Sequence, residues 1–173
     1  MPETVKYFGL GFCSKGLLKG LIAIPIHNQA GQLVAYAGRW PGDPPAEEPK
    51  YKLPPGFAKA AVVYNLNRQK KGEEVFILVE SFLSVFILHQ AGFPNALALM
   101  GSSLSEEQEA LIVAALGPGG KAALLFDADD SGRLCTQESL SRLSGKVFVK
   151  AIDISPFAKK PHQLTPEQIK ALI

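Results

Sequence analysis

The stretch KAALLFDADDSGRLCTQE, residues 121–138, decides the fold of this chain. Its first six residues follow a glycine-rich turn and form a short apolar run, which is typical of a buried strand. Residues 132–143 have a helical pattern, so the stretch predicts a strand that leads almost directly into a helix. The turn between them contains three aspartates, Asp127, Asp129 and Asp130.

The same alternation of strand and helix extends to both sides of this stretch. Short apolar runs predict further strands, and Ser105 and the glycines at 117–120 mark the two ends of a helix. Such alternation is typical of an α/β fold, with a parallel sheet flanked by helices. The remaining elements expected are strands at 75–79, 96–99 and 147–150, helices at 82–91 and from Ser105, and a terminal helix from Thr165.

The N-terminal part of the chain has a different character. Two apolar runs, 21–26 and 33–38, are separated by turn-forming residues and predict a β-hairpin, while six prolines within residues 41–56 indicate an extended loop. Residues 1–71 carry ten Lys and Arg against four Asp and Glu, whereas residues 72–173 carry eight against twelve. We therefore predict a boundary after Lys71 between a basic domain that holds a polyanion and an acidic domain that holds cations.

The composition excludes several classes of protein. A hydrophobic content of 47% over 173 residues is enough to form a packed core, which argues against disorder. Cys13 and Cys135 are far apart and have no metal-ligand spacing, so neither a disulfide framework nor a zinc site is expected. No apolar stretch has the length of a membrane span, and the first residues do not resemble a signal peptide. We expect a soluble cytoplasmic protein.

Acidic side chains follow two of the predicted strands. Glu80 comes directly after the strand at 75–79, and Asp127 and Asp129 follow the strand that begins at Lys121. In a parallel sheet, functional groups collect beyond the carboxyl ends of the strands. Converging carboxylates repel one another unless a cation neutralises them, and oxygen ligands select Mg²⁺ or Mn²⁺. The pattern therefore predicts a metal site at this edge of the sheet.

Two other patterns also fit the acidic turn. Residues 127–138 match the ligand spacing of a calcium loop, but an EF-hand needs a helix before the loop, and GPGGKAALLF predicts a strand there. A phosphatase of the haloacid-dehalogenase type also places Asp-x-Asp after a strand, and its nucleophile would be Asp127. Glu80 would then have no role.

Four motifs resemble the catalytic core of bacterial and phage-type DNA primases, and they occur in the same order. FILVESFLSVFILHQAGF (76–93) is similar to the first Toprim motif, and LLFDADDSGR (124–133) is similar to the second. Upstream, GLIAIPIHNQAGQLVAYAGRW (20–40) resembles the primase hairpin, and PKYKLPPGFAKAAVVYNL (49–66) resembles the segment that carries template-contacting lysines. The resemblance implies a Toprim sheet within residues 72–173, preceded by a smaller mixed α/β template-binding subdomain.

The resemblance also implies the roles of particular residues. Glu80 matches the acid of the family that acts in proton transfer or metal binding, and Asp127 and Asp129 match its metal-holding pair. The resemblance also implies that Arg39, Lys50 and Lys59 bind the phosphates of the template and of the incoming nucleotide. These residue types suit the role, because arginine presents a two-pronged guanidinium to phosphate and the proline-rich loop holds its lysines extended.

The chain departs from the family pattern at several acidic positions. Ser84 stands where the family has an aspartate four residues after the matching glutamate, and Ser81 replaces a glycine. KKPHQL (159–164) resembles an Asp-Pro-Asp segment, so Lys160 and His162 stand where acids are expected. Each loss removes an oxygen ligand, so we expect a weakened metal site.

The implied activity is the synthesis of short RNA primers on single-stranded DNA from ribonucleoside triphosphates, by metal-dependent nucleotidyl transfer. The implied partners in the intact protein are a replicative helicase and an upstream zinc-binding domain, as in the primases of mobile elements. Two alternatives stay open. A Toprim nuclease or nickase would share the acids but would not need the basic segment, and the missing acids favour a non-catalytic DNA-binding module.

Overall fold

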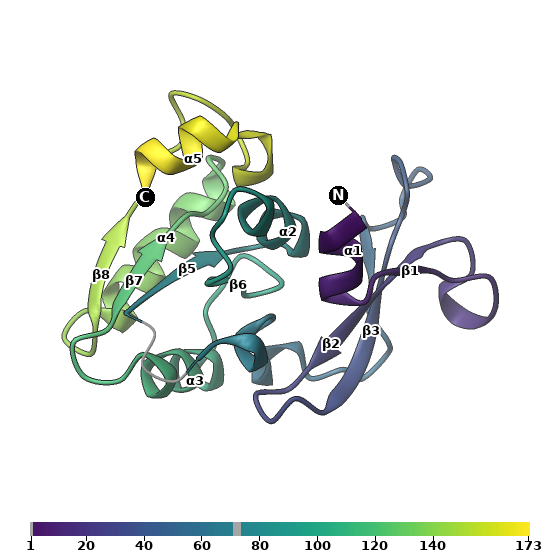
Figure 1. The fold of residues 1–173 in the computed structure, drawn as a ribbon, viewed down its shortest axis with the longest axis horizontal. Coiled ribbons are helices and arrows are strands. Elements are labelled where there is room, and N and C mark those ends of the chain that lie inside the picture. The colour runs from purple at the N-terminus through teal and green to yellow at the C-terminus, as the bar shows by residue number, and fades with distance from the viewer. Residues whose placement is uncertain (1, 71–73) are drawn as a thin grey trace. The chain divides into compact units, whose positions relative to one another are not determined.

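A computed structural model of the protein describes residues 2–70 and 74–173 (Figure 1). The chain divides into two compact units, Met1–Ala58 and Lys59–Ile173. The boundary that we predicted after Lys71 lies outside the described residues. Among the described residues, no helix combines the length and the apolar character needed to cross a membrane.

The first unit is built on a four-stranded antiparallel sheet in the order β1-β2-β3-β4. The predicted hairpin is confirmed: β2 and β3 pair from Ile22 opposite Arg39 to His27 opposite Leu33. The loop predicted at 41–56 contains no helix, as its prolines predict, but it includes the two-residue edge strand β4. The elements are α1 (Pro2–Phe8), β1 (Gly11–Phe12), the 3₁₀ helix η1 (Gly16–Leu18), β2 (Ile22–His27), β3 (Leu33–Arg39) and β4 (Tyr51–Lys52).

The second unit contains a four-stranded parallel sheet in the order β6-β5-β7-β8, and its helices follow the strands in alternation. The α/β fold predicted from the sequence is therefore confirmed. Its strands are β5 (Val75–Val79), β6 (Ala96–Ala98), β7 (Lys121–Leu124) and β8 (Phe148–Ala151). Its helices are α2 (Phe82–Gln90), α3 (Glu106–Leu116), α4 (Asp130–Leu143) and α5 (Pro166–Leu172), with short 3₁₀ helices η2 (Lys59–Ala61), η3 (Leu66–Arg68) and η4 (Pro161–Gln163).

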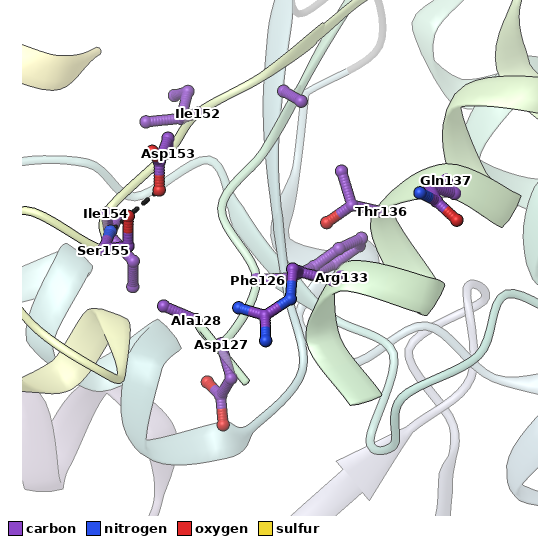
Figure 2. A pocket seen from close by; sticks show the side chains of 11 residues that line it. Phe126, Asp127, Ala128, Arg133, Thr136, Gln137, Ile152, Asp153, Ile154 and Ser155 are labelled. Carbon is purple, nitrogen blue, oxygen red and sulfur yellow. Dashed lines mark hydrogen bonds between the residues drawn. The ribbon is translucent and has the colours of Figure 1, made fainter. Parts of the chain in front are cut away.

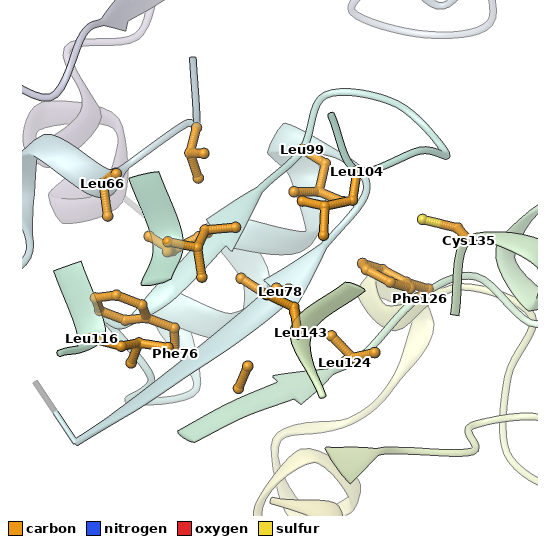
Figure 3. Close-up of a cluster of buried hydrophobic side chains, with 14 residues drawn as sticks. Leu66, Phe76, Leu78, Leu99, Leu104, Leu116, Leu124, Phe126, Cys135 and Leu143 are labelled. Atoms are coloured by element: carbon orange, nitrogen blue, oxygen red, sulfur yellow. The ribbon is translucent and has the colours of Figure 1, made fainter. Parts of the chain in front are cut away.

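The core of this unit explains why β5 is apolar along its whole length. Phe76 and Leu78 belong to a buried cluster with Leu116 of α3 and Leu143 of α4 (Figure 3). Ile77, between them in sequence, is fully buried but does not belong to that cluster. Successive side chains of a strand point to opposite faces, so both faces of the strand are covered. A continuous apolar run is the sequence signature of that arrangement.

Residues 59–64 are hydrogen-bonded to the parallel sheet and belong to the second unit. Tyr64 and Ala98 exchange two backbone hydrogen bonds, 2.9 and 3.2 Å long. The buried amide of Gln108, in the first turn of α3, donates to the carbonyl oxygens of Val62 and Leu99, each at 2.9 Å. Lys59 therefore lies in the same unit as the acidic residues.

Candidate active site

Glu80 and Asp127 are in direct contact at the carboxyl edge of the sheet. Their strands, β5 and β7, are adjacent and parallel, and Leu78 pairs with Leu124. The backbone N–H of Asp127 donates a 2.9 Å hydrogen bond to Oε1 of Glu80. The sheet thus joins two acids that are 47 residues apart in sequence.

Asp129 is the N-cap of α4. Its Oδ1 accepts a 2.9 Å hydrogen bond from the backbone N–H of Gly132. An N-terminal carboxylate satisfies a free N–H of the first turn and interacts favourably with the helix dipole. The third predicted site residue is thus held at the start of the helix by one of its two oxygens.

Gly132 allows α4 to begin against the two acids. A Cβ atom at this buried position would lie 1.9 Å from the carbonyl oxygen of Asp127 and 3.0 Å from Oε1 of Glu80. Any side chain would overlap the backbone of the acidic turn. The glycine of the Asp-x-Asp-x-x-Gly motif is therefore a steric requirement of this site.

Lys160 makes an ion pair with Asp127. Its Nζ contacts Oδ2 of Asp127, and the two side chains are 35% and 12% exposed. The segment is fixed by a 2.7 Å backbone hydrogen bond from Ala128 N–H to the carbonyl oxygen of Lys159. A lysine ammonium therefore sits on an acid that we expected to hold a metal ion.

The electrostatics of the cluster reflect its excess of acids. Burial raises the pKa of Glu80, and the charges of Asp127 and Asp129 raise it further, against the opposing effects of the Asp127 N–H and Lys160. Burial alone would lower the pKa of Lys160, but its hydrogen bond to Asp127 and the surrounding acids outweigh burial and raise it. With three carboxylates and one ammonium, the cluster carries a formal charge of about −2.

The predicted phosphate-binding groups fall in both units. Arg39, at the end of β3, has its guanidinium 5.1 Å from the ring centre of Tyr51, and Lys50 is exposed in the same unit. The ammonium of Lys59 extends over Gly101, where a Cβ atom would be 2.7 Å from Nζ. Gly101 follows β6, so Lys59 reaches the same edge of the sheet as Glu80 and Asp127.

As they stand, the acids do not form a complete metal site. In the part of the chain that the structure describes, no three His, Cys, Asp or Glu side chains are grouped closely enough to hold a metal ion. Glu80, Asp127 and Asp129 each use one oxygen in the contacts given above. Oxygen ligands from another molecule would be needed to complete the coordination of a divalent ion.

The comparisons with known proteins agree with this architecture. Residues 77–162 match the family model described as Toprim-like. This part of the chain is a Toprim-like domain. The chain is 31% identical over 150 residues, 83% of its length, to the DNA primase of Deinococcus radiodurans, of which it covers 25%. The predicted resemblance to bacterial DNA primases is therefore confirmed, and the chain spans about a quarter of the length of this relative.

Solved primase structures share the fold of the whole chain. A crystal structure of the Aquifex aeolicus primase, with its zinc-binding and RNA polymerase domains, matches at a TM-score of 0.84 and 22% identity, covering 99% of this chain and 52% of that one. A DnaG primase catalytic domain bound to single-stranded DNA matches at 0.74 and 20% identity, covering 97% and 60%. The chain thus has the fold of a primase catalytic core.

A pocket of about 370 Å³ adjoins the acidic turn of the Toprim-like domain, beyond the carboxyl ends of β7 and β8. Arg133 extends from α4 toward the loop that carries Asp127 and Ala128, as Figure 2 shows. On the facing loop, the N–H of Ser155 donates a 2.8 Å hydrogen bond to Oδ1 of Asp153. The pocket therefore presents both a guanidinium and a carboxylate next to the candidate site.

Sequence reasoning missed two features of the Toprim-like domain. The close approach at Gly132 had one local signal, a glycine in the first turn of a helix, where glycine is unfavourable. The Lys160–Asp127 ion pair joins residues 33 positions apart, and the only sign of it was a lysine where the family pattern has an acid. The calcium-loop alternative is wrong, because the acidic turn is preceded by the strand β7 and not by a helix.

Proposed function

We propose that this chain is the catalytic core of a DNA primase, which synthesises short RNA primers on single-stranded DNA from ribonucleoside triphosphates. The observation that carries the proposal is the contact between Glu80 and Asp127 at the carboxyl edge of a Toprim-like sheet. The ammonium of Lys59 at the same edge supplies a positive charge suited to a phosphate. Transfer of a phosphate-containing group requires acids that can hold a metal ion and a positive side chain that can bind phosphate, and both lie at this edge of the sheet.

In the proposed reaction, the 3′-hydroxyl of the primer attacks the α-phosphorus of the incoming nucleotide, and pyrophosphate leaves. Glu80 is suited to accept the hydroxyl proton, because burial and neighbouring acids raise its pKa above the ordinary value of a glutamate. The acids alone do not complete a metal site. We propose that Glu80, Asp127 and Asp129 bind Mg²⁺ or Mn²⁺ weakly by themselves and more tightly when nucleotide phosphates supply further oxygens.

Template binding is assigned to Arg39, Lys50 and Lys59. The excess of basic residues in positions 1–71 supports this assignment, as does the similarity to a primase domain bound to single-stranded DNA. Contacts to phosphates position DNA without reading its sequence. For the intact protein, we propose an upstream zinc-binding domain and a replicative helicase as partners.

The catalytic proposal can be tested by primer synthesis on single-stranded DNA with Mg²⁺ or Mn²⁺, using the chain within its natural full-length protein. Glu80→Gln should reduce synthesis by about a hundredfold or more while leaving the affinity for DNA unchanged, since it removes a proton acceptor. Glu107→Gln, an exposed acid of α3, is the matched control. If the parent protein binds DNA but makes no primer with either metal, the chain is a non-catalytic DNA-binding module, which the Lys160–Asp127 pair favours as the second candidate.

The template proposal is tested by DNA binding as a function of salt. Lys59→Ala should weaken binding of all template sequences by about threefold to tenfold and reduce the salt dependence by about one released counterion. Lys121→Ala, an exposed lysine at the opposite end of the sheet, should have little effect. Equal effects of the two substitutions would show that general charge, and not the Lys59 position, governs binding.

A further inference from the structure

The lysine at the acid cluster is the feature that the proposed reaction leaves unexplained. An ammonium contacts Oδ2 of Asp127, the acid that joins Glu80 to the turn. We propose that Lys160 is a resident cation of this site: it takes the place of a divalent ion on Asp127 and limits the cluster to one divalent ion. This inference rests on the proposed function, since it concerns the metal that the acids would bind.

The position of Lys160 is fixed by the backbone on both sides of it. The carbonyl oxygen of Lys159 accepts a 2.7 Å hydrogen bond from Ala128, the residue after Asp127. The N–H of Lys160 donates to Oε1 of Gln163 at 3.0 Å, and Pro161 is buried. The chain therefore presents this side chain at the acidic turn, in contrast to a lysine on a solvated loop.

The burial of the acid argues that the contact is more than a surface ion pair. Exposed pairs contribute little because water screens both charges. The side chain of Asp127 is only 12% exposed. The charges of Asp127, Asp129 and Glu80 all raise the pKa of Lys160, so its ammonium interacts with all three acids. An ammonium here relieves repulsion among three carboxylates, which is the task that a divalent ion would otherwise perform.

The charge of the cluster sets how many divalent ions it can take. Three carboxylates and one ammonium leave about two negative charges, which a single divalent ion neutralises. A second ion would make the site positive and would have to displace the ammonium from Asp127. Without Lys160 the acids would attract a divalent ion more strongly, and with an acid in its place they could hold two.

The decisive experiment is calorimetric titration of the full chain with Mn²⁺ alone, with Mn²⁺ counted by electron paramagnetic resonance. The parent should bind one ion weakly. Lys160→Met should bind Mn²⁺ about tenfold more tightly, and Lys160→Asp should bind a second ion. Lys160→Arg keeps the charge and should behave like the parent. Lys159→Met removes a neighbouring exposed lysine and should also leave binding unchanged.

Three outcomes would overturn the inference and leave the proposed function intact. They are two Mn²⁺ ions bound to the parent, equal Mn²⁺ affinities for the parent and Lys160→Met, or an equal increase in affinity for Lys159→Met and Lys160→Met.

Asp127→Asn distinguishes failure of the inference from failure of the proposed function. If this variant binds Mn²⁺ like the parent, the acids are not the metal site, and the metal-dependent function fails with the inference. Thermal unfolding of each variant identifies loss of structure, and Lys160→Arg preserves a test if Lys160→Met does not fold.

Discussion

Two groups of charged residues in the second unit differ in the balance of their charges. Glu109 of α3 accepts a 2.8 Å hydrogen bond from Nε of Arg142 and also pairs with Lys146, so one acid faces two bases. At the carboxyl edge of the sheet, Lys160 pairs with Asp127, and the charges of Glu80 and Asp129 also act on this one lysine. The first group is fully compensated by its own chain, whereas the second keeps an excess of negative charge.

The pKa shifts of the two groups have opposite directions. Hydrogen bonds from Lys146 and Arg142 outweigh burial and lower the pKa of Glu109, whereas burial and neighbouring acids raise the pKa of Glu80. A compensated acid holds α3 against the end of α4, because its charge is stabilised within the fold. An acid without such compensation, such as Glu80, destabilises the fold when it is ionised. Such destabilising charges are typical of sites that bind a ligand.

The largest effect is expected from a substitution that disrupts the acid cluster by steric overlap. Gly132→Ala should destabilise the protein by about 3 kcal/mol or more, because the new methyl group would overlap the Asp127 carbonyl and force α4 away from Glu80. Helix propensity alone would predict a gain from this substitution. Ser131→Ala, one residue earlier and exposed, should change stability by less than about 0.5 kcal/mol in the same denaturant titration. A stable Gly132→Ala protein would contradict the close approach.

The next largest effect is expected from a substitution in the compensated group of Glu109, Arg142 and Lys146. Glu109→Gln should cost about 1–2 kcal/mol, because it removes the nearest anion of the partly buried guanidinium of Arg142. Glu138→Gln is the matched control, since Glu138 is 3.8 Å from Arg142 and 43% exposed. Its cost should be below about 0.5 kcal/mol. Equal costs in urea unfolding would mean that Glu109 has no special role between the helices.

A smaller effect separates the two groups by their response to metal. Lys160→Met should cost about 1 kcal/mol, because it restores repulsion among the three acids, and millimolar Mn²⁺ should recover this loss by binding the folded state. Mn²⁺ should not recover the stability of Glu109→Gln. Thermal unfolding with and without Mn²⁺ measures both variants. Recovery of both, or of neither, would remove the distinction between the groups.

The smallest effect is a difference in pH dependence. The lowered pKa of Glu109 means that its contribution is complete above its unfolded pKa, near 4.5, and is lost as the pH falls through the folded value. The raised pKa of Glu80 means that its ionisation costs stability as the pH rises above 4.5. As the pH rises from 4 to 7, the stability of Glu80→Gln should therefore increase relative to the parent, whereas that of Glu109→Gln should decrease relative to the parent. Parallel pH profiles would contradict the opposite shifts.

Local patterns were sufficient to predict the parallel sheet of the second unit. A strand such as β5 is marked by a continuous apolar run, and the helix α3 by the serine before it and the glycines after it. The convergence of Glu80 and Asp127 was also predictable, because acids that follow parallel strands collect at one edge. That the two strands are immediate neighbours was not, since sheet order depends on the packing of the whole unit.

The sequence by itself determined the elements, the edge at which the acids collect and the family resemblance, because these depend on periodicity, turn residues and short motifs. Only the tertiary structure decided which charges meet. Lys160 contacts Asp127 and Arg142 contacts Glu109, each across 33 residues, and Gln108 joins the segment after Lys59 to the parallel sheet. Such pairings depend on how the strands and helices pack. The sequence around a charged residue does not indicate which distant residue will become its partner.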